Sequence, residues 1–113
     1  MLAVSSSTRI YLYRGVTDMR KSFNGLSAII QDSFPGELLS GSLFLFLNRS
    51  RNRVKLLYWD SDGFALWYKH LQKGRFKLPS DDERYLLQRR ELMALLEGVT
   101  PLKFESRFSF EKS

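Results

Sequence analysis

The sequence contains no cysteine, and this absence excludes disulfide bonds, thiolate catalysis and cysteine-ligated zinc. Long hydrophobic runs are also missing, because the longest, Leu43–Leu47, is far shorter than the ~20 residues of a membrane-spanning helix. The opening residues MLAVSSSTR lack the basic start and the long apolar middle of a signal peptide. These absences predict a soluble cytoplasmic protein that has no membrane partner.

Residues suited to catalysis are scarce as well. His70 is the only histidine, and no motif places a serine or an acid beside it. Asp60 and Asp62 resemble the aspartate loop of a phosphatase, but a strand-like segment follows them where that chemistry needs a helix. Residues 81–83, Asp-Asp-Glu, fit a helix cap better than a two-metal site, whose carboxylates converge from separate elements. We therefore predict no catalytic residue, no metal and no cofactor, with a small metal-dependent nuclease as the enzymatic alternative.

The composition is that of one globular domain. The chain has 113 residues, of which 43% are hydrophobic and 14% aromatic, enough for a single core. We predict a polar leader over residues 1–8, a single α+β domain over 9–99 and an amphipathic tail over 100–113. In the tail, leucine and phenylalanine alternate with charged residues, a pattern typical of a strand or of a segment that binds a partner.

Apolar periodicity and turn residues predict a mainly antiparallel β meander of about four to six strands, flanked by two helices. Apolar residues spaced three and four apart predict a first helix that begins at Thr17 or Asp18 and ends near Asp32. A second helix is expected from Ser80 to near Gly98. The expected strands are residues 9–14, 43–47, 53–59, 64–71 and 75–78.

The strands 53–59 and 64–71 are expected to form a hairpin around the turn Asp60–Gly63, with Gly63 at a positive φ. If Trp59 pairs with Phe64, then Arg53 pairs with His70 at the far end. This register places aromatic side chains near the turn and cations away from it. Four aromatic residues on the hairpin suit either core packing, the commoner role, or stacking on unpaired bases: Tyr58, Trp59, Trp67 and Tyr68.

The net charge of +6 is concentrated in one quarter of the chain. Residues 49–77 carry eight cations against Asp60 and Asp62, while cations and acids are equal in number elsewhere. In the run Arg49–Lys55, RSRNRVK, a cation stands at every second position, and neighbouring like charges repel. Phosphates along a nucleic-acid backbone would relieve that repulsion and release counterions. The predicted nucleic-acid-binding residues are Arg49, Arg51, Arg53, Lys55, Lys69, Lys73, Arg75 and Lys77; the alternative is a solvated strand face.

Two blocks of sequence resemble the accessory protein TnpB of insertion sequences of family 66. The first block is Asp18–Leu26, DMRKSFNGL. The second agrees in order and spacing at Lys55–Asp60, Asp62–Phe64, Tyr68–Lys69, Leu71, Lys73–Phe76 and Pro79. The similarity covers residues 9 to 99 and includes Leu95–Val99. It does not extend to the RNA-guided nucleases that share the name TnpB.

The resemblance implies a protein encoded beside a separate DDE-type transposase that supports transposition, and it assigns no catalytic residue. We therefore predict a non-enzymatic accessory protein that supports transposition and contacts DNA through the basic hairpin. The alternative is an adaptor that docks on the transposase without contacting DNA itself. The expected partners are DNA and the transposase of the same element, and a homodimer is left open.

Overall fold

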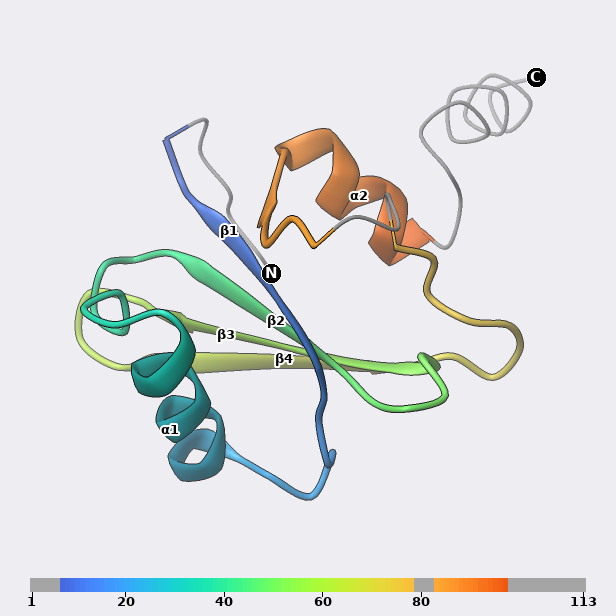
Figure 1. Cartoon of the computed structure of the whole chain (residues 1–113), viewed down its shortest axis with the longest axis horizontal. Coiled ribbons are helices and arrows are strands. Elements are labelled where there is room, and N and C mark those ends of the chain that lie inside the picture. Colours follow the sequence, from blue (N-terminus) through green and yellow to red (C-terminus); the bar gives the residue numbers. More distant parts are fainter. Residues whose placement is uncertain (1–6, 79–82, 98–113) are drawn as a thin grey trace.

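The computed structural model describes residues 7–78 and 83–97, which form one five-stranded sheet with a helix on each face (Figure 1). In chain order the elements are β1 (Ile10–Val16), α1 (Phe23–Ser33), β2 (Leu43–Leu47), β3 (Arg53–Trp59), β4 (Phe64–His70), β5 (Leu86–Leu87) and α2 (Arg89–Glu97). The strand order is β4-β3-β2-β1-β5. The predicted α+β class is confirmed. Neither helix is long and apolar enough to cross a bilayer.

The central strand β2 is buried along its whole length, as its continuous apolar sequence predicts. Side chains alternate between the two faces of a strand, so its three leucines pack under α2 and its two phenylalanines pack under α1. Leu92 and Leu95 close the first core from α2, while Leu26 and Ile30 close the second from α1. Each helix therefore covers one face of the same sheet.

The sheet is mixed rather than purely antiparallel. β2, β3 and β4 form an antiparallel meander, and β5 pairs antiparallel with β1. β1 and β2 run parallel because α1 connects them as a crossover. β1 also continues past Gly15 to Val16, with a register irregularity between Leu12 and Val16.

The first helix begins at Phe23, five residues after Asp18, where the sequence predicted its start. Asp18 does not cap the helix, because its carboxylate accepts a hydrogen bond from the backbone amide of Arg20 at 2.9 Å within a tight turn. Ser22 holds the cap position, and the Leu26 amide donates to its carbonyl at 3.0 Å. The predicted apolar stripe is nevertheless confirmed at Leu26 and Ile30, which are fully buried.

The C-terminal part of the fold differs more from expectation. Residues 75–78 are not a strand, and the fifth strand is formed instead by Leu86 and Leu87, which were expected to be helical. They pair with the edge of β1, and such a long-range pairing cannot be predicted from local secondary-structure propensity. The second helix consequently begins at Arg89, where Glu91 caps it by accepting from the Gln88 amide at 2.8 Å.

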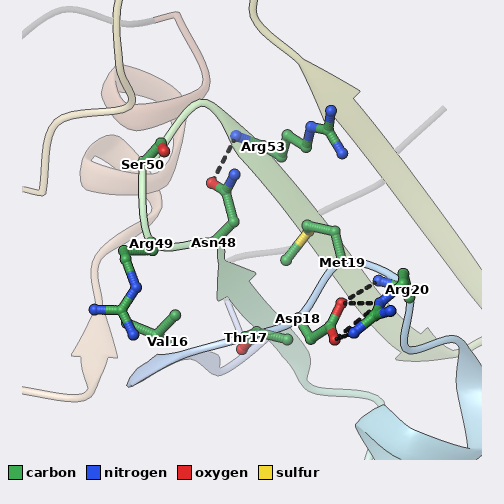
Figure 2. A pocket seen from close by; sticks show the side chains of 9 residues that line it. All are labelled: Val16, Thr17, Asp18, Met19, Arg20, Asn48, Arg49, Ser50 and Arg53. Atoms are coloured by element: carbon green, nitrogen blue, oxygen red, sulfur yellow. Dashed lines mark hydrogen bonds and ion pairs between the residues drawn. The ribbon is translucent and has the colours of Figure 1, made fainter.

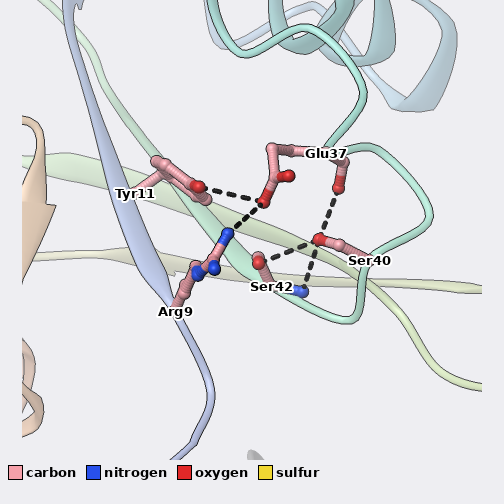
Figure 3. Close-up of polar contacts among 5 residues, drawn as sticks. All are labelled: Arg9, Tyr11, Glu37, Ser40 and Ser42. Carbon is pink, nitrogen blue, oxygen red and sulfur yellow. Dashed lines mark hydrogen bonds and ion pairs between the residues drawn. The ribbon is translucent and has the colours of Figure 1, made fainter.

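A polar network fastens the connection between α1 and β2 to the start of β1 (Figure 3). Glu37 accepts hydrogen bonds from the Tyr11 hydroxyl at 2.9 Å and from the Arg9 guanidinium at 3.5 Å. Ser40 donates to the Glu37 carbonyl at 2.6 Å and accepts from the Ser42 amide at 3.2 Å. Burial raises the pKa of the Tyr11 phenol, and its bond to Glu37 raises it further. Arg9 is thus a cation with an acidic partner.

Several predicted features lie outside the described residues. They are most of the leader, residues 79–82 with Asp81 and Asp82, and everything from Gly98 onward. The domain boundaries and the role of the amphipathic tail therefore remain predictions.

Candidate nucleic-acid interface

The β3–β4 hairpin has the register that the sequence predicts. All seven pairs from Trp59–Phe64 to Arg53–His70 are present without a slip. Arg53 and His70 therefore mark one end of the hairpin and the turn Asp60–Gly63 the other. At about 3.3 Å per residue these ends are about 20 Å apart. The separation of cations from acids along the hairpin is therefore a property of the fold.

The turn between β2 and β3 holds three arginines around one asparagine. The Asn48 side-chain oxygen accepts from the backbone amides of Asn52 at 3.1 Å and Arg53 at 3.0 Å, and its amide nitrogen donates to the Asn52 side chain at 2.7 Å. These bonds fix a tight turn in which Arg49 and Arg51 are exposed. Arg51 has a φ of 56°, a left-handed conformation that costs a non-glycine residue about 1 kcal/mol. The turn presents these two cations to solvent.

A second basic segment lies directly beside this turn. The Leu71 amide donates to the Asn52 carbonyl at 2.8 Å, and the Phe76 amide donates to the Arg51 carbonyl at 2.6 Å. Phe76 is buried in the core under α2, which leaves its basic neighbours exposed. We define the basic surface as the six cations that these two segments bring together: Arg49, Arg51, Arg53, Lys73, Arg75 and Lys77.

A cavity of about 520 Å³ lies between the turn and the connection from β1 to α1 (Figure 2). Arg49 and Arg53 line it from the turn, and Arg20 lines it from the connection. Arg20 was missed by the sequence reasoning because it lies outside the basic window, although it belongs to the DMRK block. Its guanidinium binds the Asp18 carboxylate at 2.7 Å and, by these hydrogen bonds, lowers the pKa of that carboxyl to about 2. With Asp18 ionised, the three arginines leave the cavity with a net positive charge.

Lys55 does not belong to the exposed basic surface, contrary to the sequence prediction. It is buried, and its ammonium donates to the carbonyls of Met19 at 2.8 Å and Lys21 at 2.7 Å. The same ammonium lies 5.3 Å from the centre of the Tyr68 ring. Lys55 therefore fastens the β1–α1 connection to β3, and its charge is directed into the protein.

Lys69 also lies apart from the basic surface. It is on the face of the sheet that α2 covers, and its ammonium donates to the carbonyl of Leu96, near the end of that helix, at 3.2 Å. Trp67 lies on the same face and packs against the core, which supports the core interpretation for this tryptophan. Trp59 is half-buried and packs edge-on against Phe64, with ring centres 4.9 Å apart. Six of the eight predicted cations thus lie on two adjacent segments and are exposed or half-exposed.

The acidic turn at the other end of the hairpin has a different geometry from the predicted one. Ser61, not Gly63, has the positive φ, at 53°. The chain continues directly into β4, so no helix follows Asp60 and Asp62. Across residues 7–78 and 83–97, no three potential metal ligands form a group.

Comparison with known proteins identifies the family. The family model described as "IS66 Orf2 like protein" matches residues 8–106. The chain belongs to this family. Membership in it associates the chain with transposition as an accessory protein of an insertion sequence.

Two curated relatives from Sinorhizobium fredii (strain NBRC 101917 / NGR234) are similar over nearly their full length. Uncharacterized protein y4hO is 33% identical over 100 residues, which cover 88% of this chain and 87% of the relative. Uncharacterized protein y4jC is 29% identical over 96 residues, covering 85% and 82%. No solved structure matches the chain.

The two sequence blocks that resemble the family meet at Lys55. The first block supplies the Met19 and Lys21 carbonyls, and the second block begins with the lysine that binds them. Because Arg20 lies between those two carbonyls, this contact also sets the wall of the basic cavity. The two sequence blocks therefore help to position the basic cavity, although Lys55 itself adds no exposed charge to it.

Proposed function

We propose that this protein is a non-enzymatic accessory factor of transposition that binds the phosphate backbone of DNA through the basic surface. The observation that carries the proposal is the accumulation of six exposed or half-exposed cations from two adjacent segments. Along the described ranges 7–78 and 83–97, none of the six has an acidic partner. Like charges held together in this way repel, and a polyanion relieves the repulsion.

The shape of the site supports phosphate as the ligand. Guanidinium groups present several N–H donors in a plane and bind phosphate oxygens in pairs. Arg49 and Arg53 line the cavity from the turn, and Arg20, whose guanidinium is paired with Asp18, lines it from the other side.

The proposed contact is with the backbone and not with particular bases. Phosphate contacts hold and orient a protein on DNA but carry no sequence information. The basic surface is a patch on a turn and a loop, and it has no helix that would enter the major groove. We therefore expect weak sequence preference. Because bacterial DNA lies in the cytoplasm, the same role places the protein there.

A pair of double variants tests the proposal. Arg49→Ser with Arg51→Ser removes two charges from the basic surface, and Arg89→Ser with Arg90→Ser removes two exposed charges from α2. The first variant is expected to bind a DNA duplex on the order of tenfold more weakly, and the second should bind like the unchanged protein. Equal losses in both would show that only the total charge matters and would reject the basic surface as the binding site.

The adaptor alternative predicts a different result from the same proteins. A phosphate-driven contact weakens steeply as salt rises, whereas an apolar contact with the transposase does not. Co-purification with the transposase of the element is therefore to be followed across a salt series, with and without DNA. Retention at high salt without DNA, unaffected by Arg49→Ser with Arg51→Ser, would favour the adaptor.

A further inference from the structure

The strand β4 forms one edge of the sheet. It pairs with β3 along all seven residues, and no other described residue pairs with it. Backbone groups of an antiparallel strand point alternately to one neighbour and to the other. The Asp60 amide donates to the Gly63 carbonyl, and the Leu71 amide donates to the Asn52 carbonyl. The backbone groups of the odd-numbered residues from 63 to 71 therefore face β3. The outward groups therefore belong to Phe64, Leu66, Tyr68 and His70.

This edge lacks the features that usually prevent association of edge strands. It contains no proline, and its pairing with β3 shows no bulge. Its one lysine, Lys69, is turned towards α2 and bonded to the Leu96 carbonyl. Leu66 and Tyr68 are instead 41% and 47% exposed on the other face, where α1 does not cover them. An apolar, regular and unprotected edge of this length is suited to pairing with another strand.

We propose that β4 pairs antiparallel with β4 of a second copy, about a two-fold axis at Trp67. Trp67 is the middle residue of the strand, so this register pairs all of β4 with nothing left over. About eight backbone hydrogen bonds then form between the outward groups. The two sheets then join into one continuous sheet, and both copies use the same surface, as in an isologous interface.

The side chains are self-complementary in this register. Leu66 lies opposite Tyr68 of the partner subunit. The two-fold axis repeats this contact, so both exposed side chains are covered in each copy. Lys69 lies opposite Ala65 of the partner subunit, and no two like charges face each other. Because the edge is self-complementary, we propose a second copy of this chain as the binding partner of β4. The pairing uses the outer edge of β4, whereas Arg49 and Arg51 lie on the β2–β3 turn, so the two proposals can fail separately.

Sedimentation of the full chain over a concentration series tests the association. We expect a reversible dimer. In Leu66→Lys with Tyr68→Lys, lysines of the two copies face each other, and the dimer dissociation constant should rise about tenfold or more. Leu66→Lys with Tyr68→Glu places opposite charges across the axis and should recover most of the association. The control Leu39→Lys with Met93→Lys changes two exposed apolar residues elsewhere and should dimerise normally.

The absence of cysteine from the sequence permits a direct test of the register. Positions 66 and 68 of opposite copies should be about 5.5 Å apart between Cα atoms, a separation that a disulfide spans. Mixing Leu66→Cys with Tyr68→Cys should give covalent dimers under oxidation, while either variant alone should give few. A chain that stays monomeric at all concentrations overturns the proposal. The edge would then be free, or would pair with the chain's own tail or with the transposase. Equal cross-linking of either variant alone also overturns the proposal.

Discussion

The two turns that flank β3 carry opposite charges. Each holds one non-glycine residue in the left-handed region, Arg51 at φ 56° in one turn and Ser61 at φ 53° in the other. The first turn is lined by arginines and lies against a second basic segment. The second contains two aspartates and lies among aromatic side chains. The turns therefore share a left-handed residue but differ in the charge that they carry and in what surrounds them.

The basic turn differs from the acidic turn in its charge and not in backbone strain. Backbone strain occurs in both turns, so strain alone does not distinguish a binding site. Convergence of charge from segments far apart in sequence occurs only at the basic turn among the residues that the structure describes. The fold keeps the acids of the other turn about 20 Å away along β3. Within one copy, the basic end is therefore separated from these acids.

Lys55 is a cation of β3 that belongs to neither turn, and its replacement is expected to have the largest effect on stability. Lys55→Met should lower the free energy of unfolding by about 2 kcal/mol, since it removes two charge-assisted hydrogen bonds and leaves two carbonyls unpaired. The matched change Arg53→Met, two residues away on the same face, should change stability by less than about 0.5 kcal/mol and weaken DNA binding instead. Chemical denaturation measures the first effect. Similar stability in both variants would contradict the structural role of Lys55.

Replacing each left-handed residue by glycine separates backbone strain from charge. Arg51→Gly and Ser61→Gly should each raise the free energy of unfolding by about 0.5 kcal/mol, because relief of strain exceeds the entropy gained by the unfolded chain. Only Arg51→Gly should also lose affinity for DNA, by a fewfold. Thermal unfolding and DNA titration of the two variants check this. A loss of affinity in Ser61→Gly would break the distinction between the turns.

Asp18 is the one acid in the wall of the basic cavity, and its removal is expected to have the smallest effect. Asp18→Asn keeps the acceptor for the Arg20 amide but frees the guanidinium, so DNA affinity should rise about twofold. Fluorescence anisotropy with a labelled duplex measures the change. Weaker binding would mean that Asp18 positions Arg20 for the contact and does not compete with the phosphate.

The same carboxylate gives a dependence on pH with a defined sign. Its pKa of about 2 in the folded protein lies below the ordinary value of 3.8, because the ionised form accepts hydrogen bonds from Arg20. The resulting contribution to stability is complete above pH 3.8 and is lost as the pH falls towards 2. An NMR titration of the carboxyl carbon should show its midpoint near 2, and a midpoint near 3.8 would contradict the ion pair.

Much of the sheet could be predicted from sequence because its signals are local. A continuous apolar run defines β2, and a turn sequence between two alternating segments defines the register of β3 with β4. The start of α2 could not be predicted in this way. Leu86 and Leu87 leave the helix to pair with the edge of β1, which lies more than seventy residues earlier.

The site was predicted only in part for the same reason. The basic window located the arginines of the turn, because that charge is contiguous in sequence. It included Lys55, whose burial depends on two carbonyls from another part of the chain. It omitted Arg20, which the fold brings into the cavity. The position of Lys55 on the same face as the buried Leu57 was a signal of its burial.

The most direct test of the account is the dependence of DNA affinity on salt. If about four phosphates are neutralised, the logarithm of the association constant should fall with the logarithm of salt concentration with a slope near −3.6. In the triple variant Arg49→Ser, Arg51→Ser, Arg53→Ser the slope should become shallower by up to about 2.7. An unchanged slope and affinity in the triple variant, for duplex and single-stranded DNA alike, would contradict binding at the basic surface.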